Sequence, residues 1–170
     1  FIDYARKNPG KLNYASTNAT GLVGMKTIAR IAGLDLVNVP YKATPQALTD
    51  LMSGEIQAML IDIASGSAQI KAGNVRALAV TTKERSALLP DLPGTREAGL
   101  PEFGVNSWNG IFGPANVPAP VTARLHAELR KIAEDRDVAQ RLAQIGFDAF
   151  SSTREEVAQF GRDELVQWTK

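Results

Sequence analysis

The runs Ala58-Met59-Leu60-Ile61 and Ala77-Leu78-Ala79-Val80 decide the fold class of this chain. Both are apolar at every position, whereas a strand with one face in water alternates apolar and polar residues. Strands that are apolar on both faces are typical of parallel sheets covered by helices on each side. The two runs therefore predict an α/β fold.

Strand and helix patterns alternate around these runs. We expect strands at residues 12–15, 36–39, 56–61 and 75–80. The helices between them should end at Gly33, Gly54 and Gly73, because glycine readily takes the left-handed conformation that closes a helix. Thr44 and Pro45 predict an N-cap and a first helical residue. Four strands separated by three helices give a right-handed α/β layer structure.

A Pro- and Gly-rich loop is expected at residues 89–101, followed by an extended stretch at residues 103–112. Three amphipathic helices then complete the chain. Pro120 opens the first helix, Asp135 or Asp137 caps the second, and the capping box Thr153-Arg-Glu-Glu156 opens the third. In the first helix Val121, Leu125, Leu129 and Ile132 should lie on one apolar stripe. These helices have no strands of their own to cover, which indicates a covering lobe outside this chain or self-association.

Composition excludes several classes of function. The 170 residues carry a formal net charge of +1, with 19 basic and 18 acidic residues spread along the chain. Nucleic-acid binding needs a clustered basic face, so we expect no nucleic-acid partner. The absence of cysteine excludes disulfides and zinc–thiolate sites, and no apolar run approaches the ~18 residues of a membrane span.

The chain begins at Phe1 without an initiator Met or a signal peptide, and we interpret it as part of a longer protein. His126, the single histidine, lies one residue past Leu125 on its helix and should face solvent. A Ser-His-Asp triad or a zinc site at this histidine is therefore not expected. We predict a protein without catalytic activity, bound metal or cofactor.

The segment Tyr14-Ala-Ser-Thr-Asn-Ala-Thr-Gly-Leu22 carries the strongest signal for a binding site. It joins a strand to a helix, where unpaired backbone N–H groups and the helix dipole suit a carboxylate or a phosphate. The candidate residues of this turn are Ser16, Thr17, Asn18, Ala19 and Thr20. In the alternative interpretation one of them caps the helix and the others are solvated. The segment has neither the G-x-G-x-x-G nor the P-loop pattern, so nucleotides are not favoured.

Three residues outside this turn are further candidates for ligand binding. Asp62 follows a strand at the same sheet edge and would accept a hydrogen bond from a ligand or, alternatively, cap the next helix. Tyr41 follows another strand end, and Lys42 beside it would assist an anion unless it is a solvated loop lysine. Trp108 is either a core residue or a hinge residue that contacts the cleft.

Seven short motifs occur in the order of one known family. They are Asn8-Pro-Gly-Lys-Leu-Asn-Tyr-Ala-Ser16, Val39-Pro-Tyr-Lys42, Ala47-Leu-Thr-Asp-Leu-Met-Ser-Gly54, Ile70-Lys-Ala-Gly-Asn-Val-Arg-Ala-Leu-Ala-Val80, Leu89-Pro-Asp-Leu-Pro93, Glu97-Ala-Gly-Leu-Pro101 and Ser107-Trp-Asn-Gly-Ile-Phe-Gly-Pro114. With these motifs the chain resembles the Bug family, the solute receptors of tripartite tricarboxylate transporters, over nearly its whole length.

The resemblance implies the Venus-flytrap fold of type II periplasmic-binding proteins, with one complete α/β lobe and the C-terminal helices of the other lobe. Residues 1–7 would be a remnant helix of the first lobe and residues 8–106 the second lobe. Residues 107–170 would be the return crossing and the first lobe's C-terminal helices.

The implied function is periplasmic capture of a small carboxylate for a secondary transporter, whose membrane components would be the partners. The ligand would be a di- or tricarboxylate, an acidic amino acid or an aromatic acid. The far end of this ligand would meet the turn from Ser16 to Thr20. Relatives often have Gly-Ser-Gly-Thr where this chain has Ala15-Ser-Thr-Asn18, so their ligands do not transfer directly.

Three other interpretations are open. The effector-binding half of a LysR-type transcription regulator shares the two-lobed fold and would follow a helix-turn-helix segment. A Rossmann-type enzyme domain would need a glycine fingerprint and a base–nucleophile set that this sequence lacks. A sensory receptor of the same family would signal to a membrane kinase instead of supplying a transporter.

Overall fold

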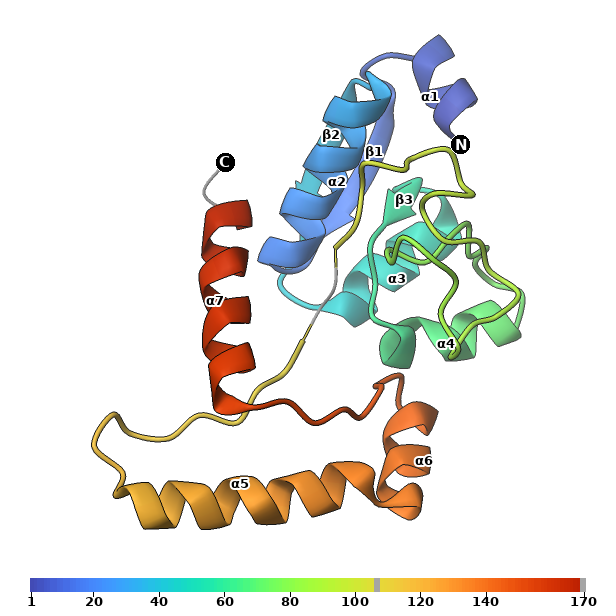
Figure 1. The fold of residues 1–170 in the computed structure, drawn as a ribbon. Coiled ribbons are helices and arrows are strands. Elements are labelled where there is room, and N and C mark those ends of the chain that lie inside the picture. The colour runs from blue at the N-terminus through green and yellow to red at the C-terminus, as the bar shows by residue number, and fades with distance from the viewer. Residues whose placement is uncertain (106–107, 169–170) are drawn as a thin grey trace. The chain divides into compact units, whose positions relative to one another are not determined.

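The structure, a computed structural model, describes residues 1–105 and 108–168. It forms two compact units, Phe1–Asn109 and Gly110–Lys170, which we describe separately as unit 1 and unit 2 (Figure 1). The predicted lobe boundary between residues 106 and 107 lies outside the described residues, as does Ser107, which opens the last family motif. The assignment of the chain to two lobes therefore stays a prediction.

Unit 1 is built around a parallel sheet of three strands in the order β2-β1-β3. The strands are β1 (Leu12–Ser16), β2 (Leu36–Pro40) and β3 (Ala58–Met59). The helices are α1 (Ile2–Lys7), α2 (Ala19–Ala32), α3 (Thr44–Ser53) and α4 (Ile63–Lys71). The α/β architecture with a parallel sheet, predicted from the sequence, is confirmed.

Two helices of unit 1 end at a glycine in a left-handed turn, as predicted, whereas the C-cap of α4 is Ala72, one residue before the predicted Gly73. Gly33 and Gly54 are the C-caps of α2 and α3, with φ angles of 64° and 85°. The start of α3 differs from the prediction, because Thr44 is already helical and its N-cap is Ala43. Pro45 lacks an N–H group and fits anywhere in a first turn, so it does not fix the first residue to better than one position.

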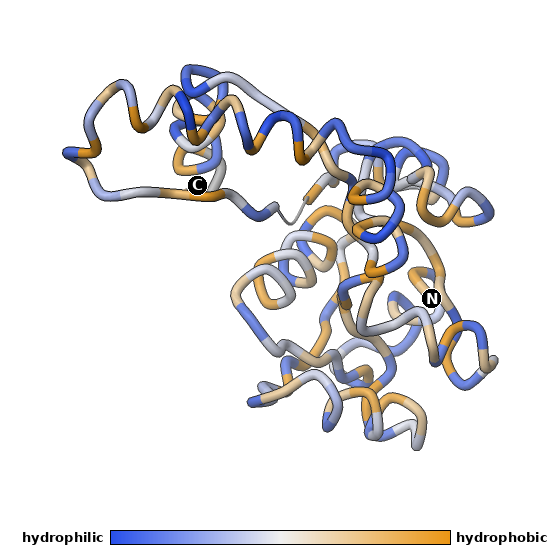
Figure 2. The backbone as a smooth tube through the Cα atoms, turned by 90° about the horizontal axis from the view of Figure 1, so that it is seen from below, coloured by the Kyte–Doolittle hydropathy of each residue, from blue (hydrophilic) through white to orange (hydrophobic). Residues whose placement is uncertain are grey.

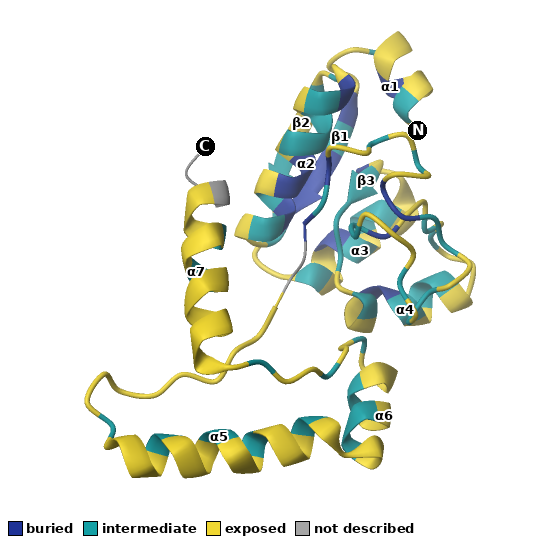
Figure 3. Ribbon diagram, viewed as in Figure 1, coloured by how far each residue is buried: buried dark blue, intermediate teal, exposed yellow. Residues whose placement is uncertain are grey.

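The core of unit 1 lies on both faces of β1. On one face Ala15 packs with Ala47 of α3 and with Ile56, all of them 2% exposed or less. Leu12 and Tyr14 point to the opposite face, because side chains alternate along a strand, and both are buried. Figure 3 shows β1 as mostly buried, and of its five residues only Asn13 is half-buried. The central strand is therefore covered from both sides.

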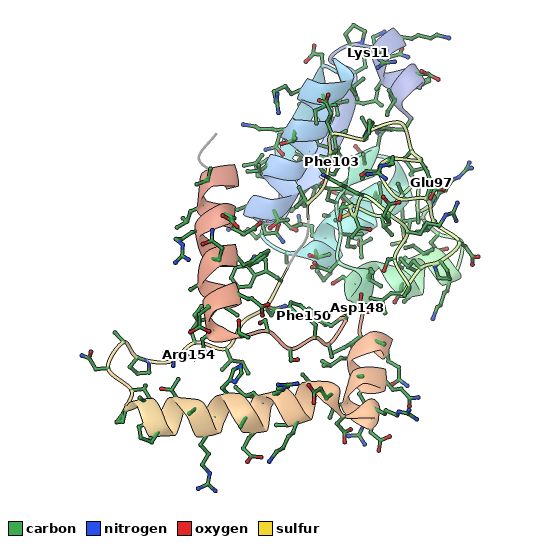
Figure 4. All side chains as sticks on the ribbon, in the orientation of Figure 1. Lys11, Glu97, Phe103, Asp148, Phe150 and Arg154 are labelled. Atoms are coloured by element: carbon green, nitrogen blue, oxygen red, sulfur yellow. The ribbon has the colours of Figure 1, made fainter. Side chains whose placement is uncertain are left out.

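Phe103 belongs to this core although it lies far along the chain in the loop region (Figure 4). It is 1% exposed, and its ring tip comes within 3.8 Å of the position that a Cβ on Gly24 would occupy. Leu60 lies against the same glycine of α2. The absence of a side chain on Gly24 thus lets the loop region pack closely on the helix.

The prediction of a fourth strand at residues 75–80 is wrong, because the structure has no strand at these residues. Leu78 is 54% exposed, so this run is not buried on both faces. Its backbone is held by the Pro- and Gly-rich loop instead, since the Val80 N–H group donates to the Pro93 carbonyl oxygen at 3.0 Å. β3 likewise has only two of the residues predicted for 56–61.

Unit 2 consists of α5 (Ala119–Glu134), α6 (Arg136–Gln144) and α7 (Arg154–Trp168). The predicted caps are confirmed. The Asp135 carboxylate accepts the N–H groups of Asp137 and Val138, at 2.9 and 3.0 Å. Thr153 and Glu156 form the reciprocal bonds of the capping box, at 3.1 and 2.7 Å. None of the helices in the described ranges has the length and hydrophobicity of a membrane span.

Unit 2 leaves most of the apolar stripe predicted on α5 uncovered, in line with the expectation that these helices need a partner from outside this chain. Val121, Leu125 and Ile132 are 48, 55 and 51% exposed, and only Leu129 is half-buried. His126, predicted to face solvent, is half-buried, and its Nε2 lies 2.9 Å from the Ser152 carbonyl oxygen.

Apolar residues recur along the helices of both units (Figure 2), yet no side chain described in unit 2 is buried. Contacts within unit 2 therefore leave most of its apolar residues exposed. The sequence pattern alone could not decide which face of α5 would pack inside the unit.

We predict that Gly94→Ala lowers the free energy of unfolding by about 1–3 kcal/mol, the usual effect of overpacking. A methyl group at Gly94 would collide with the backbone of Lys83 and Glu84, which cannot rotate away. Gly104→Ala is the matched control, because its methyl group would meet only the Lys83 side chain, with Cγ at 3.3 Å. Urea unfolding followed by circular dichroism checks both variants, and equal losses would contradict the prediction.

Candidate binding site at the sheet edge

Parallel pairing brings the ends of three strands to one edge of the sheet. β1 pairs Ser16 with Pro40 of β2 and Ala15 with Met59 of β3. The segments that follow these strands therefore leave the sheet at the same edge, where open α/β sheets bind their ligands (Figure 1). A Cβ on Gly21 would lie 3.9 Å from the Leu60 carbonyl oxygen, so the first turn of α2 approaches the segment that follows β3.

The turn from Ser16 to Thr20 joins β1 to α2 at this edge. Ser16 ends the strand and is 7% exposed, Thr17 and Thr20 are half-buried, and Asn18 and Ala19 are exposed. Asn18 is the N-cap of α2: its Oδ1 accepts the Gly21 N–H group at 2.8 Å. One residue of the turn thus caps the helix, as the alternative interpretation expected, but Ser16 is buried and not solvated.

The cap leaves two neighbouring backbone donors without a partner. Asn18 satisfies the N–H groups of Gly21 and Leu22, with its side chain and its carbonyl oxygen respectively. Among the residues that the structure describes, the N–H groups of Ala19 and Thr20 have no such acceptor. Unpaired N–H groups at the positive end of a helix dipole suit an anionic oxygen.

Tyr41 lies beside the turn but its hydroxyl group is engaged elsewhere. Its N–H group donates to the Ser16 carbonyl oxygen at 2.9 Å, and its hydroxyl group donates to Oδ2 of Asp50 at 2.7 Å. The hydrogen bond to Asp50, together with burial, raises the pKa of Tyr41 above its ordinary value. The side chain also borders the core cluster of Ala15. Tyr41 therefore positions the end of β1.

Sequence reasoning missed Asp50, the acceptor of that bond. The two residues are nine positions apart, with Tyr41 after a strand and Asp50 on α3. No motif links a tyrosine at a strand end to a carboxylate on the following helix. Only the path of the chain from β2 into α3 brings them together.

Asp62 occupies the N-cap position of α4, yet its carboxylate accepts no capping hydrogen bond from that helix. The predicted N-cap position is confirmed, but it is the Asp62 carbonyl oxygen that accepts the N–H groups of Ser65 and Gly66, at 3.1 and 3.0 Å, so the carboxylate is not used in the cap. Asp62 and Lys42 are both exposed, one following β3 and the other following β2. The edge thus carries one negative and one positive side chain that are open to solvent.

Trp108 lies in an extended segment outside any helix or strand. Its side chain is 36% exposed, so it is not the core residue that one interpretation expected. Its role as a hinge residue stays a prediction. In the described ranges, no group of three His, Cys, Asp or Glu side chains is placed to hold a metal ion.

Comparison with known proteins relates the whole chain to one receptor family. The profile described as "Tripartite tricarboxylate transporter family receptor" matches residues 1–170. A UPF0065 protein from the tcbD–tcbE intergenic region of Pseudomonas sp. strain P51 is 36% identical over 169 residues, which cover 98% of this chain and 50% of that protein.

Solved structures of similar proteins share the fold. R. palustris Rpa4515 with adipate has a TM-score of 0.87 at 27% identity, over 99% of this chain and 57% of that one. MatC from Rhodopseudomonas palustris with bound malate has a TM-score of 0.79 at 30% identity, over 99% of this chain and 59% of that one. The chain spans about half the length of these relatives.

We predict that Tyr41→Phe removes a pH-dependent contribution to stability. A tyrosine whose pKa is raised on folding stabilises the protein below its unfolded-state pKa of about 10, and this contribution is lost as the pH rises through the folded-state pKa. The variant should therefore be less stable than the wild type near neutral pH, and the difference should shrink at strongly alkaline pH. Urea unfolding at a series of pH values measures it.

Tyr4→Phe on α1, where the side chain is 64% exposed, is the matched control and should show no such trend. A stability difference between Tyr41→Phe and the wild type that stays constant with pH would contradict the proposed contribution of the Asp50 hydrogen bond.

Proposed function

Because the chain belongs to the tripartite tricarboxylate transporter receptor family, we propose that its protein is a periplasmic receptor that captures a small carboxylate without chemically changing it. Proteins of this family are periplasmic solute-binding receptors. Relatives with adipate and with malate support a carboxylate as the ligand class. The resemblance seen in the sequence motifs is thereby confirmed as family membership.

The observation that carries the proposal is the pair of N–H groups at Ala19 and Thr20, for which the described part of the chain offers no acceptor. One carboxylate of the ligand would accept both groups, because hydrogen bonds to an ionised acceptor are about twice as strong as neutral ones. The hydroxyl groups of Thr17 and Thr20 supply further donors in the same turn. Asn18 holds the turn in place through its cap, and Tyr41 holds the end of β1.

Asp62 would select among carboxylates. Its carboxylate repels a second anion but accepts a hydrogen bond from a hydroxyl or ammonium group. A hydroxy acid or an amino acid would therefore benefit from Asp62, whereas a plain dicarboxylate would not. Lys42, following β2, is available to offset the negative charge of a ligand.

Residues 8–106 would be the second lobe of the receptor, and residues 107–170 would be the return crossing and C-terminal helices of the first lobe. Ligand that bridges the two lobes would stabilise the closed form by its differential affinity, and the closed form would dock on the membrane components of a transporter. The exposed apolar residues Val121, Leu125 and Ile132 would be covered by the rest of the receptor or by self-association. Signalling to a membrane kinase is the second role that this family assignment leaves open.

The double variant Thr17→Val, Thr20→Val tests the turn, in a receptor that joins this chain to the remaining half of the family fold. Ligand at ~100 times its Kd should stabilise the wild type by about 2.7 kcal/mol. Removing two hydroxyl donors should weaken binding by about 1–3 kcal/mol, or roughly fivefold to 150-fold. Thermal shift and calorimetry with mono-, di- and tricarboxylates, amino acids and aromatic acids measure both quantities.

Thr49→Val is the matched control, because Thr49 lies on the exposed side of α3 and its hydroxyl group bonds only to the Pro45 carbonyl oxygen at 3.1 Å. It should leave affinity unchanged. Stabilisation by a nucleotide or a sugar, with none from any acid, would rule out the carboxylate receptor and leave only the fold.

Asp62→Asn tests ligand selection at the same edge. The variant should bind malate more weakly by about 1 kcal/mol, because an amide is a weaker acceptor for the ligand hydroxyl group than a carboxylate. It should bind adipate, which has no hydroxyl group, as tightly as the wild type or more tightly. Calorimetry with the two acids measures the ratio, and equal changes for both would contradict a selective role for Asp62.

A further inference from the structure

Asn109 and Gly110 form the sole Asn-Gly pair in the sequence. Both residues are exposed and lie outside any helix or strand. Asn109 is the last residue of unit 1 and Gly110 is the first residue of unit 2. Water and solvent base therefore reach the peptide bond between them.

We infer that Asn109 is a site of spontaneous deamidation. The backbone nitrogen of Gly110 loses its proton, attacks Cγ of Asn109 and expels ammonia, which closes a five-membered imide. Water then opens the imide at either of its two carbonyl carbons. The products are an aspartyl linkage, which keeps the original main chain, and an isoaspartyl linkage, in which the main chain runs through the former side chain.

The pair meets the two requirements of this reaction. Glycine has no Cβ, so nothing hinders the approach of its nitrogen to the neighbouring Cγ, and its backbone reaches conformations closed to other residues. The extended, exposed segment leaves Asn109 without the fixed backbone geometry of a helix or a strand. Proximity of the attacking nitrogen then makes the intramolecular step fast.

Four of the asparagines that the structure describes make hydrogen bonds through their side chains. The Nδ2 groups of Asn8, Asn13 and Asn74 donate hydrogen bonds of 2.9, 3.1 and 2.7 Å, and Oδ1 of Asn18 caps α2. Each of these bonds must break before Cγ can turn toward the next backbone nitrogen.

Asn116 is the useful comparison. It is exposed and lies in a turn of the same connecting region, but the next residue is Val117. A β-branched side chain crowds the backbone nitrogen and restricts the conformations from which it could attack. Asn116 should therefore deamidate much more slowly than Asn109 although both side chains are open to solvent.

Deamidation would change the chain where unit 1 passes into unit 2. Each product carries one additional negative charge, and the isoaspartyl product lengthens the main chain by one methylene group. The modified and unmodified chains thus differ in charge and in the spacing of the two units along the backbone. The reaction needs only water.

The purified chain, incubated at mildly alkaline pH and body temperature, tests the inference. Intact mass should rise by one dalton with time, and fragment spectra after acidic proteolysis should place the change at Asn109. We expect the rate there to exceed that at Asn116 by about tenfold or more. Methyl transfer from S-adenosylmethionine by an isoaspartyl methyltransferase reports the isoaspartyl product.

Gly110→Val should slow the change at Asn109 to about the rate at Asn116, which separates the effect of the following residue from that of exposure. Circular dichroism shows whether this variant keeps the wild-type fold. Equal rates at Asn109 and Asn116 in the wild-type chain, or no mass change at Asn109, would overturn the inference.

Discussion

β1 is hydrogen-bonded along both of its edges, to β2 and to β3, and both pairings run parallel. Because the register pairs Ser16 with Pro40 and Ala15 with Met59, the strand ends cannot shift without exposing Ala15 or Tyr14. A slip of one residue would turn every side chain of β1 to the wrong face. The position of the turn after Ser16, and with it the candidate site, depends on this double pairing.

Sequence pattern predicted those parts of the fold that local chemistry decides. A glycine after each apolar helix correctly predicted where α2 and α3 end. Asp135 and Thr153 correctly predicted where the helices that they cap begin. The turn after β1 was found because it joins a strand to a helix. In the same turn, only the structure could show that Asn18 takes the capping role and that the donors at Ala19 and Thr20 stay free.

The failures share a cause that is not local. The run at residues 75–80 has the composition of a buried strand, but a strand needs a neighbour with free backbone groups, and the loop at Pro93 takes the bond of Val80 instead. His126 on α5 was expected to face solvent, but the chain returns after α6 and places the Ser152 carbonyl oxygen 2.9 Å from its Nε2. Asp50 was missed for the same reason. Which partner a segment meets depends on the path of the whole chain.

The cap at Asn18 has a consequence for how the turn can vary. Its side chain orders the backbone, and the backbone itself presents the donors at Ala19 and Thr20. Main-chain N–H groups survive every substitution except proline. In the proposed receptor, side chains around them could therefore be exchanged to fit acids of different length while the main chain still anchored one carboxylate. A receptor built in this way could change its preference among acids by side-chain substitution and still bind a carboxylate.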